Sequence, residues 1–123
     1  MMAINLKESL NHLTELGSVE GALVVDSEGL IMESNFPSTV DTELLGSVYA
    51  IIDLNVKGQL NSLSLQPNQI FFSTDQMLII IQKIEDVLLI IYSKKENLAE
   101  LQSRLEQSAA QVHDFLNISR NNS

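Results

Sequence analysis

The sequence predicts an α+β domain with the element order αββαβββα, in which one five-stranded antiparallel sheet is covered by helices on both faces. Two observations support this prediction. Residues 77–83 and 86–92 are apolar at nearly every position, which is typical of strands buried on both faces. Three longer segments carry apolar residues at helical spacing, so helices are available to cover both faces of the sheet.

The first half of the chain predicts a helix, a hairpin and a second helix. Asn5 and Glu8 have the spacing of a capping box, and leucines follow at helical spacing. Gly29 ends an acidic turn, where it can adopt a positive φ at no steric cost. Ser38, with Asp41 three residues later, is the expected N-cap of the second helix. The expected elements are a helix over about residues 5–16, the strands ALVV (22–25) and LIME (30–33), and a helix over about residues 39–60.

The second half predicts a three-stranded meander and a final helix. The polar segment 59–69 contains Pro67 and is interpreted as a connector. Ser93 and Glu96 form another capping box before a long apolar stripe, and the tail from Ser119 is expected to fray. We expect a single domain over residues 1–123 with an ordered core of about 5–117. The expected elements are strands at about 69–74, 77–83 and 86–92, and a helix that ends near residue 117.

Composition limits the function classes. The 123 residues include 16 acidic and 7 basic side chains, and the formal net charge is -9. Such a surface repels nucleic acid and anionic membranes, whereas a partner with a basic patch is attracted. The chain has no cysteine, which excludes disulfides and thiolate metal sites. No stretch is long and apolar enough for a membrane span or a signal peptide, so we expect a cytoplasmic protein without direct membrane insertion.

The second predicted helix has two different faces when its residues are projected at 100° per residue. One broad arc is apolar, and the other face carries small residues that permit close approach of a partner helix. A solvated face of small residues is the alternative interpretation. The apolar arc consists of Leu44, Leu45, Val48, Ile51, Ile52 and Val56, and the small-residue face consists of Gly46, Ser47, Ala50 and Leu54.

Three stretches, together with this order of elements, resemble the Roadblock family, relatives of a dynein light chain. They are GALVVDSEGLI at residues 21–31, QIFFSTDQMLIIIQKIEDVLLIIY at 69–92 and NLAEL at 97–101. The resemblance extends from about residue 5 to residue 117. The connector with Pro67 departs from the pattern and leaves the start of the following strand open.

The resemblance implies a dimer and a regulatory role. Roadblock-like proteins usually dimerise through the second helix and the third strand, and many of them bind Ras-like small GTPases. An edge strand with three large apolar residues is also an aggregation hazard unless a twin strand covers it. No active site, cofactor or metal is expected. The implied homodimer interface consists of Gly46, Ser47, Ala50, Leu54, Ile70, Phe71 and Phe72.

Residues that could support catalysis are few. His12 and His113 lie far apart, and neither belongs to a metal-binding motif. Arg104 lies in the middle of a helix, where it is expected to pair with Glu100 and not to reach a neighbour's active site. No phosphate-loop or nucleophile-elbow sequence occurs. Three carboxylates surround the hairpin turn and are expected to be solvated: Asp26, Glu28 and Glu33.

The sequence therefore favours a non-catalytic homodimeric scaffold or regulator that binds a Ras-like small GTPase and biases its nucleotide state. The alternative is a structural light chain of a larger motor or signalling assembly. A small-ligand sensor is less favoured, because the strands are filled with large apolar residues that suit a packed core. Dependence of partner binding on GDP or GTP would separate the first two hypotheses.

Overall fold

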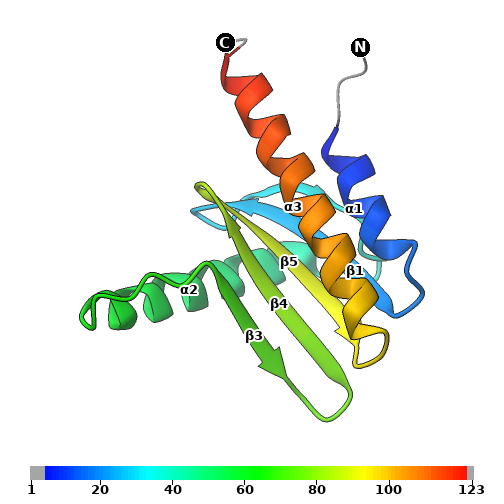
Figure 1. Cartoon of the computed structure of the whole chain (residues 1–123), viewed down its shortest axis with the longest axis horizontal. Coiled ribbons are helices and arrows are strands. Elements are labelled where there is room, and N and C mark those ends of the chain that lie inside the picture. The colour runs from blue at the N-terminus through cyan, green and yellow to red at the C-terminus, as the bar shows by residue number, and fades with distance from the viewer. Residues whose placement is uncertain (1–4, 122–123) are drawn as a thin grey trace.

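The computed structural model describes residues 5–121 of the chain, and its helices and strands follow the predicted order αββαβββα (Figure 1). All five predicted strands are present, each within a few residues of its expected bounds. The elements are α1 (Leu6–Thr14), β1 (Val19–Asp26), β2 (Ile31–Ser34), α2 (Thr42–Asn61), β3 (Gln69–Ser73), β4 (Met77–Ile84), β5 (Val87–Lys94) and α3 (Leu98–Asn121).

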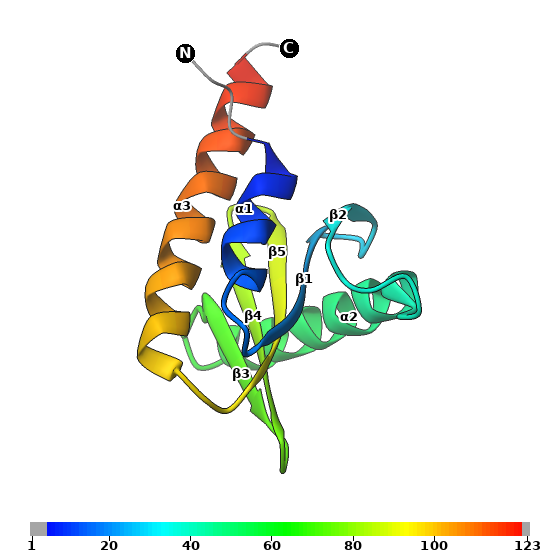
Figure 2. The same cartoon turned by 90° about the vertical axis from the view of Figure 1, so that its right-hand side faces the viewer.

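The strands form one antiparallel sheet in the order β2-β1-β5-β4-β3. Helices α1 and α3 stand side by side on one face of this sheet, and α2 lies across the other face (Figure 2). This arrangement confirms the predicted fold class, a five-stranded antiparallel sheet with helices on both faces. Among residues 5–121, no helix is both long enough and apolar enough to cross a bilayer.

Two apolar cores lie on opposite faces of the sheet. The larger core joins α1 and α3 to the sheet, with Leu10 and Leu105 among its buried side chains. The smaller core lies between the sheet and α2, where Leu23 and Ile90 point toward the helix side. Because β1, β4 and β5 supply side chains to both cores, these strands are nearly continuous apolar runs in the sequence.

The N-cap of α1 is the residue that the sequence predicts, whereas the N-cap of α2 is a different residue. Asn5 accepts a hydrogen bond from the backbone N–H of Glu8 at 2.8 Å, so the predicted capping box of α1 is confirmed. The expectation that Ser38 caps α2 is wrong. Asp41 does so instead, because its Oδ1 accepts from the backbone N–H of Leu44 at 3.1 Å.

The predicted start of α3 is also wrong. Ser93 is not a cap but a buried residue of β5, and its hydroxyl donates to the backbone carbonyl of Lys94 at 2.8 Å. The backbone of Lys94 in turn donates to the carbonyl of Ser18, which extends the strand ladder beyond the predicted end of β5. Asn97 then adopts a φ of 54°, and α3 begins only at Leu98.

Two further differences concern the connector and the tail. The connector between α2 and β3 is less polar at its surface than predicted, because Leu63 and Leu65 are both more than half exposed. The start of β3, left open by the sequence, is Gln69. The tail was expected to fray from Ser119, but α3 continues to Asn121, and the last two residues lie outside the described range.

Candidate interaction surface

Helix α2 meets the sheet along one side only. Leu45, Tyr49 and Ile52 pack against the smaller core, so this side of the helix faces the strands. The hydroxyl groups of Tyr49 and Tyr92 lie 2.6 Å apart and form a hydrogen bond between α2 and β5. Burial, followed by this bond, raises the pKa of the Tyr92 phenol. This polar contact fixes the rotation of α2 on the sheet.

The small residues of α2 contact the chain's own hairpin. A Cβ atom on Gly46 would lie 2.7 Å from the carbonyl oxygen of Gly29 and 3.0 Å from Cγ1 of Val25. Ala50 is 9% exposed and lies against the same turn, where Gly29 has a φ of +87°. Gly46 and Ala50 therefore permit the close approach of the hairpin within one chain.

The opposite side of α2 is apolar and bare. Leu44, Ile51 and Leu54 are 58%, 59% and 69% exposed, and Val48 is also exposed. The predicted apolar arc is thus divided, because its members Leu45 and Ile52 face the sheet. Its members Leu44, Val48 and Ile51 face outward. We call Leu44, Val48, Ile51 and Leu54 the bare face of α2. A helix that is apolar on nearly all sides is normally covered on nearly all sides.

Strand β3 forms one edge of the sheet and pairs only with β4. Ile70 and Phe72 are partly buried under α2, whereas Phe71 points to the other face and is 51% exposed. An edge strand presents unpaired backbone groups on its outer side. The bare face of α2 and this edge therefore both present surface that suits a protein partner.

The seven residues predicted for the interface fall into two groups in the structure. One group is exposed and available for contact with another chain, namely Ser47, Leu54 and Phe71 together with the edge backbone of β3. The other group is partly or fully buried within the chain, namely Gly46, Ala50, Ile70 and Phe72. Val48 and Ile51 were not predicted to belong to the interface. Their spacing of three and four residues along the helix, together with Leu44, places them on one face and could have indicated it.

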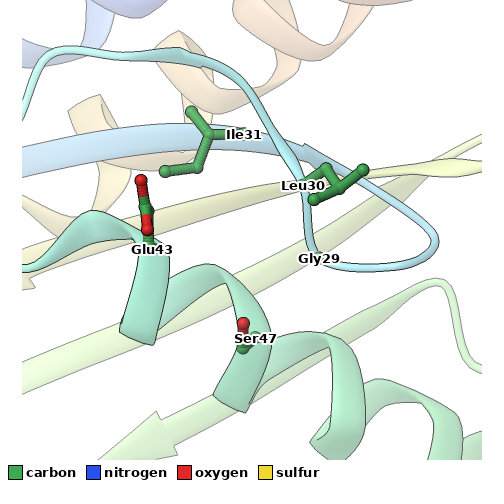
Figure 3. A pocket seen from close by; sticks show the side chains of 5 residues that line it. All are labelled: Gly29, Leu30, Ile31, Glu43 and Ser47. Carbon is green, nitrogen blue, oxygen red and sulfur yellow. The ribbon is translucent and has the colours of Figure 1, made fainter.

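A groove of about 370 Å³ lies between the hairpin tip and the first half of α2. Figure 3 shows Leu30 and Ile31 on the hairpin side and Glu43 and Ser47 on the helix side. Leu30 is 62% exposed and gives the groove an apolar wall that a partner could cover. The groove combines apolar contact with a carboxylate at its rim, so it suits an apolar side chain with a basic neighbour.

The remaining candidates for chemistry have structural roles. Asp26 accepts backbone N–H bonds from Glu28 and Leu30 at 2.9 and 3.0 Å and so holds the hairpin turn. Arg104 bonds to Glu100 as predicted, but it also donates to the backbone carbonyl of His12 at 2.8 Å. Within the described part of the chain, no group of His, Asp and Glu residues could hold a metal ion.

The family comparison gives a match over most of the chain. Residues 6–93 match the family described as the Roadblock/LC7 domain. No curated protein matches the sequence.

Several solved structures share the fold. MglB of Myxococcus xanthus superposes with a TM-score of 0.85 and 15% identity, over 91% of this chain and 94% of that one. The gliding protein MglB of Thermus thermophilus gives a TM-score of 0.80 with 15% identity, over 89% and 87% of the two chains. A Roadblock/LC7 domain from Streptomyces avermitilis gives 0.78 with 12% identity, over 89% and 95%.

Proposed function

The chain belongs to the Roadblock/LC7 domain family, and from this premise we propose that it is a homodimeric platform that binds a Ras-like small GTPase and biases its nucleotide state. Family membership supports a non-catalytic regulatory or adaptor role associated with small GTPases. The bare face of α2 is the observation that carries the proposal, because a contiguous apolar patch exposed to water is typical of a surface that binds another protein.

The bare face of α2 suits a second copy of the chain. Its four large side chains are apolar, and each is exposed by 40% or more. A twofold axis places the same patch on both protomers, so each bare face covers the other. Burial of apolar surface stabilises such a contact by about 25 cal/mol per Å² before the entropy of association is subtracted. A solved MglB structure is described as having a tetrameric arrangement, so self-association occurs in a protein of this fold.

The edge of β3 supports the same arrangement. Pairing of β3 with its twin joins the two sheets into one and satisfies backbone groups that otherwise face water. Phe71 lies on this strand and is half exposed, so the joint also shields its ring. A twofold axis perpendicular to the sheet at this edge keeps both α2 helices on the same face of the joined sheet.

The GTPase is proposed to contact the hairpin and α2 groove. Glu43 and the nearby turn residue Glu28 give this region a negative charge, in a chain with a net charge of -9. A basic patch on the partner is attracted to it. A rigid groove that fits one GTPase conformation better than the other shifts the partner's population toward that conformation. No residue of this chain has to take part in GTP hydrolysis.

Self-association is tested with Leu54→Glu and Phe71→Glu. Both side chains are largely exposed in one chain, so each substitution leaves the folded protomer intact and places a charge in the contact. We expect both variants to sediment as monomers where the wild type is a dimer. Leu98→Glu is the matched control, because Leu98 is 51% exposed on α3, which lies on the face of the sheet opposite α2. Dimers of unchanged stability in both variants would contradict the proposed interface.

Nucleotide dependence is tested by affinity capture from native lysate, divided between added GDP and a non-hydrolysable GTP analogue. A small GTPase retained in only one nucleotide state, and lost with Leu30→Glu in the groove, supports the regulatory platform. A large assembly retained equally in both states favours the light-chain role instead. Leu30 is exposed, so its substitution does not disturb the core.

A further inference from the structure

The sheet has two edges, and they differ in regularity and charge. The strand order β2-β1-β5-β4-β3 leaves one side of β2 and one side of β3 without a neighbouring strand among residues 5–121. An edge strand exposes backbone N–H and C=O groups that can pair with a strand of another chain. Proteins that avoid such pairing introduce a bulge in the edge strand or place charged side chains on it, lysine above all. Both features occur at β2.

Strand β3 has neither feature. Its five residues, Gln69–Ser73, pair with β4 without a shift in register. They include no charged residue and no proline, and Phe71 is half exposed. The outer side of β3 is therefore a regular, uncharged edge, which suits the addition of a further strand.

The pairing of β2 with β1 is irregular. The register shifts between Val24 and Val25, whose partners on β2 are Glu33 and Ile31. Met32 is therefore an extra residue on β2 and forms a β-bulge. A bulge bends the strand and increases its local twist. The outer side of β2 is thus less able than that of β3 to align with a strand of a second chain.

The backbone groups of Ser34 point away from β1. The backbone N–H of Asn35 donates to the carbonyl of Ala22 at 3.1 Å, so the backbone of Asn35 faces β1. Inward and outward backbone groups alternate along an antiparallel strand, so the N–H and C=O of the preceding residue, Ser34, face the open edge. A strand that added to β2 would have to bond to these two groups.

Both outward groups of Ser34 are already bonded within the chain. Nζ of Lys7, on α1, donates to the Ser34 carbonyl at 2.8 Å. The Ser34 N–H donates to Oε2 of Glu33 at 3.2 Å. The Lys7 ammonium lies 4.0 Å from the same carboxylate oxygen, so the two side chains place a pair of opposite charges at the open edge. A further strand would have to displace both side chains, and burial of their charges would cost free energy.

We propose that Lys7 and Glu33 close the β2 edge against strand addition. A strand of another chain then has only the β3 edge to pair with. In a homodimer joined at β3, both outer edges of the extended sheet are β2 edges, so closure there ends the assembly at two copies. With both edges open, alternating β3–β3 and β2–β2 contacts would continue into an open array. The limit of two copies rests on the proposed dimer, whereas the closure of β2 does not.

The test is the double variant Lys7→Met/Glu33→Met, measured by sedimentation velocity over a range of protein concentrations. The two substitutions remove one positive and one negative charge, so the net charge stays at -9. We expect species larger than a dimer, with an average mass that rises with concentration, where the wild type stays a dimer. Glu20→Met/Lys94→Met is the matched control and should sediment as the wild type does. Its two residues form an exposed pair at 3.7 Å, but they lie on the inner strands β1 and β5.

Addition of Phe71→Glu separates the closure of β2 from the proposed dimer. Only the β2 edge is open in this triple variant, so assembly is expected to stop at two copies. A monomeric wild type, together with a double variant that forms dimers, would contradict the proposed dimer and support the closure of β2.

Three results would overturn the closure of β2. The first is a double variant with the mass distribution of the wild type at every concentration. The second is a Glu20→Met/Lys94→Met control that forms assemblies of the same size, because exposed methionines alone then account for them. The third is a double variant whose larger species have lost the far-ultraviolet circular dichroism of the wild type, because unfolding then causes the assembly.

Discussion

Gly46→Ala tests whether the small residues of α2 serve the hairpin of the same chain. The added Cβ meets the carbonyl oxygen of Gly29 at 2.7 Å and Cγ1 of Val25 at 3.0 Å. The carbonyl is backbone, and its turn is tied by the bond from the Gly29 N–H to the carbonyl of Asp26 at 3.0 Å. The turn therefore cannot move away freely, and α2 has to shift from the hairpin.

The magnitude follows from two opposing terms. Alanine is preferred over glycine in a helix interior by about 1 kcal/mol. Overpacking of a filled contact costs about 1–3 kcal/mol. Gly46→Ala is thus expected to lower the free energy of unfolding by about 1 kcal/mol. Gly58→Ala, on the same helix with nothing of its own chain within 4 Å of the new Cβ, is expected to raise it by about 0.5–1 kcal/mol.

The assay is urea unfolding followed by far-ultraviolet circular dichroism, since the chain has no tryptophan. Measurement at several protein concentrations separates folding from self-association, because the stability of a dimer depends on concentration. The difference between the two variants isolates the steric cost at Gly46. Equal stabilisation by Gly46→Ala and Gly58→Ala would refute the close contact with Gly29 and leave Gly46 available to a partner helix.

Two further predictions concern α1, α3 and the tyrosine pair. Arg104→Met removes the bond to the His12 carbonyl at the end of α1 and should lower the urea midpoint by an amount equivalent to about 1 kcal/mol, whereas an unchanged midpoint would show that this bond does not stabilise the docking of α1 on α3. The pKa of Tyr92 is raised, first by burial and then by Tyr49, so the folded state holds its proton longer than the unfolded state. The contribution of the protonated Tyr92 to the free energy of unfolding is therefore fully present below pH 10, the ordinary pKa of tyrosine, and it decreases as the pH rises above 10. Tyr92→Phe should flatten this fall in a series of urea titrations, and an identical slope in both proteins would contradict the assignment.

The strands were predictable from sequence because their signal is local and strong. Residues 77–83 and 86–92 are apolar at nearly every position, and such short runs rich in isoleucine are typical of strands buried on both faces. The start of α3 was not predictable in the same way. Ser93 has the local form of a cap, but its backbone pairs with Val19 in β1 and with Leu78 in β4. The backbone pairing of Ser93 with two neighbouring strands stabilises the strand conformation more than a single capping hydrogen bond would stabilise a helix start.

The orientation of α2 was not predictable from periodicity. The helix is apolar around most of its circumference, so the pattern does not indicate which arc faces the sheet. That choice depends on the contact of Gly46 with Gly29 and on the bond of Tyr49 with Tyr92, and both partners are distant in sequence. Of the four residues predicted to form the small-residue face, only Leu54 belongs to the bare face in the structure.

Helix α2 joins the two proposed contact surfaces mechanically. Ser47 lines the groove beside Leu30 and also lines a second hollow beside Ile51 and Leu54 of the bare face. The hairpin turn is fixed to the same helix through Gly29. A partner that binds the groove of the dimer more tightly than that of the monomer must strengthen the dimer by the same factor, because the two equilibria are linked. The close contact of Gly29 with Gly46 is a route by which a shift of the turn on partner binding would reach α2 and its bare face.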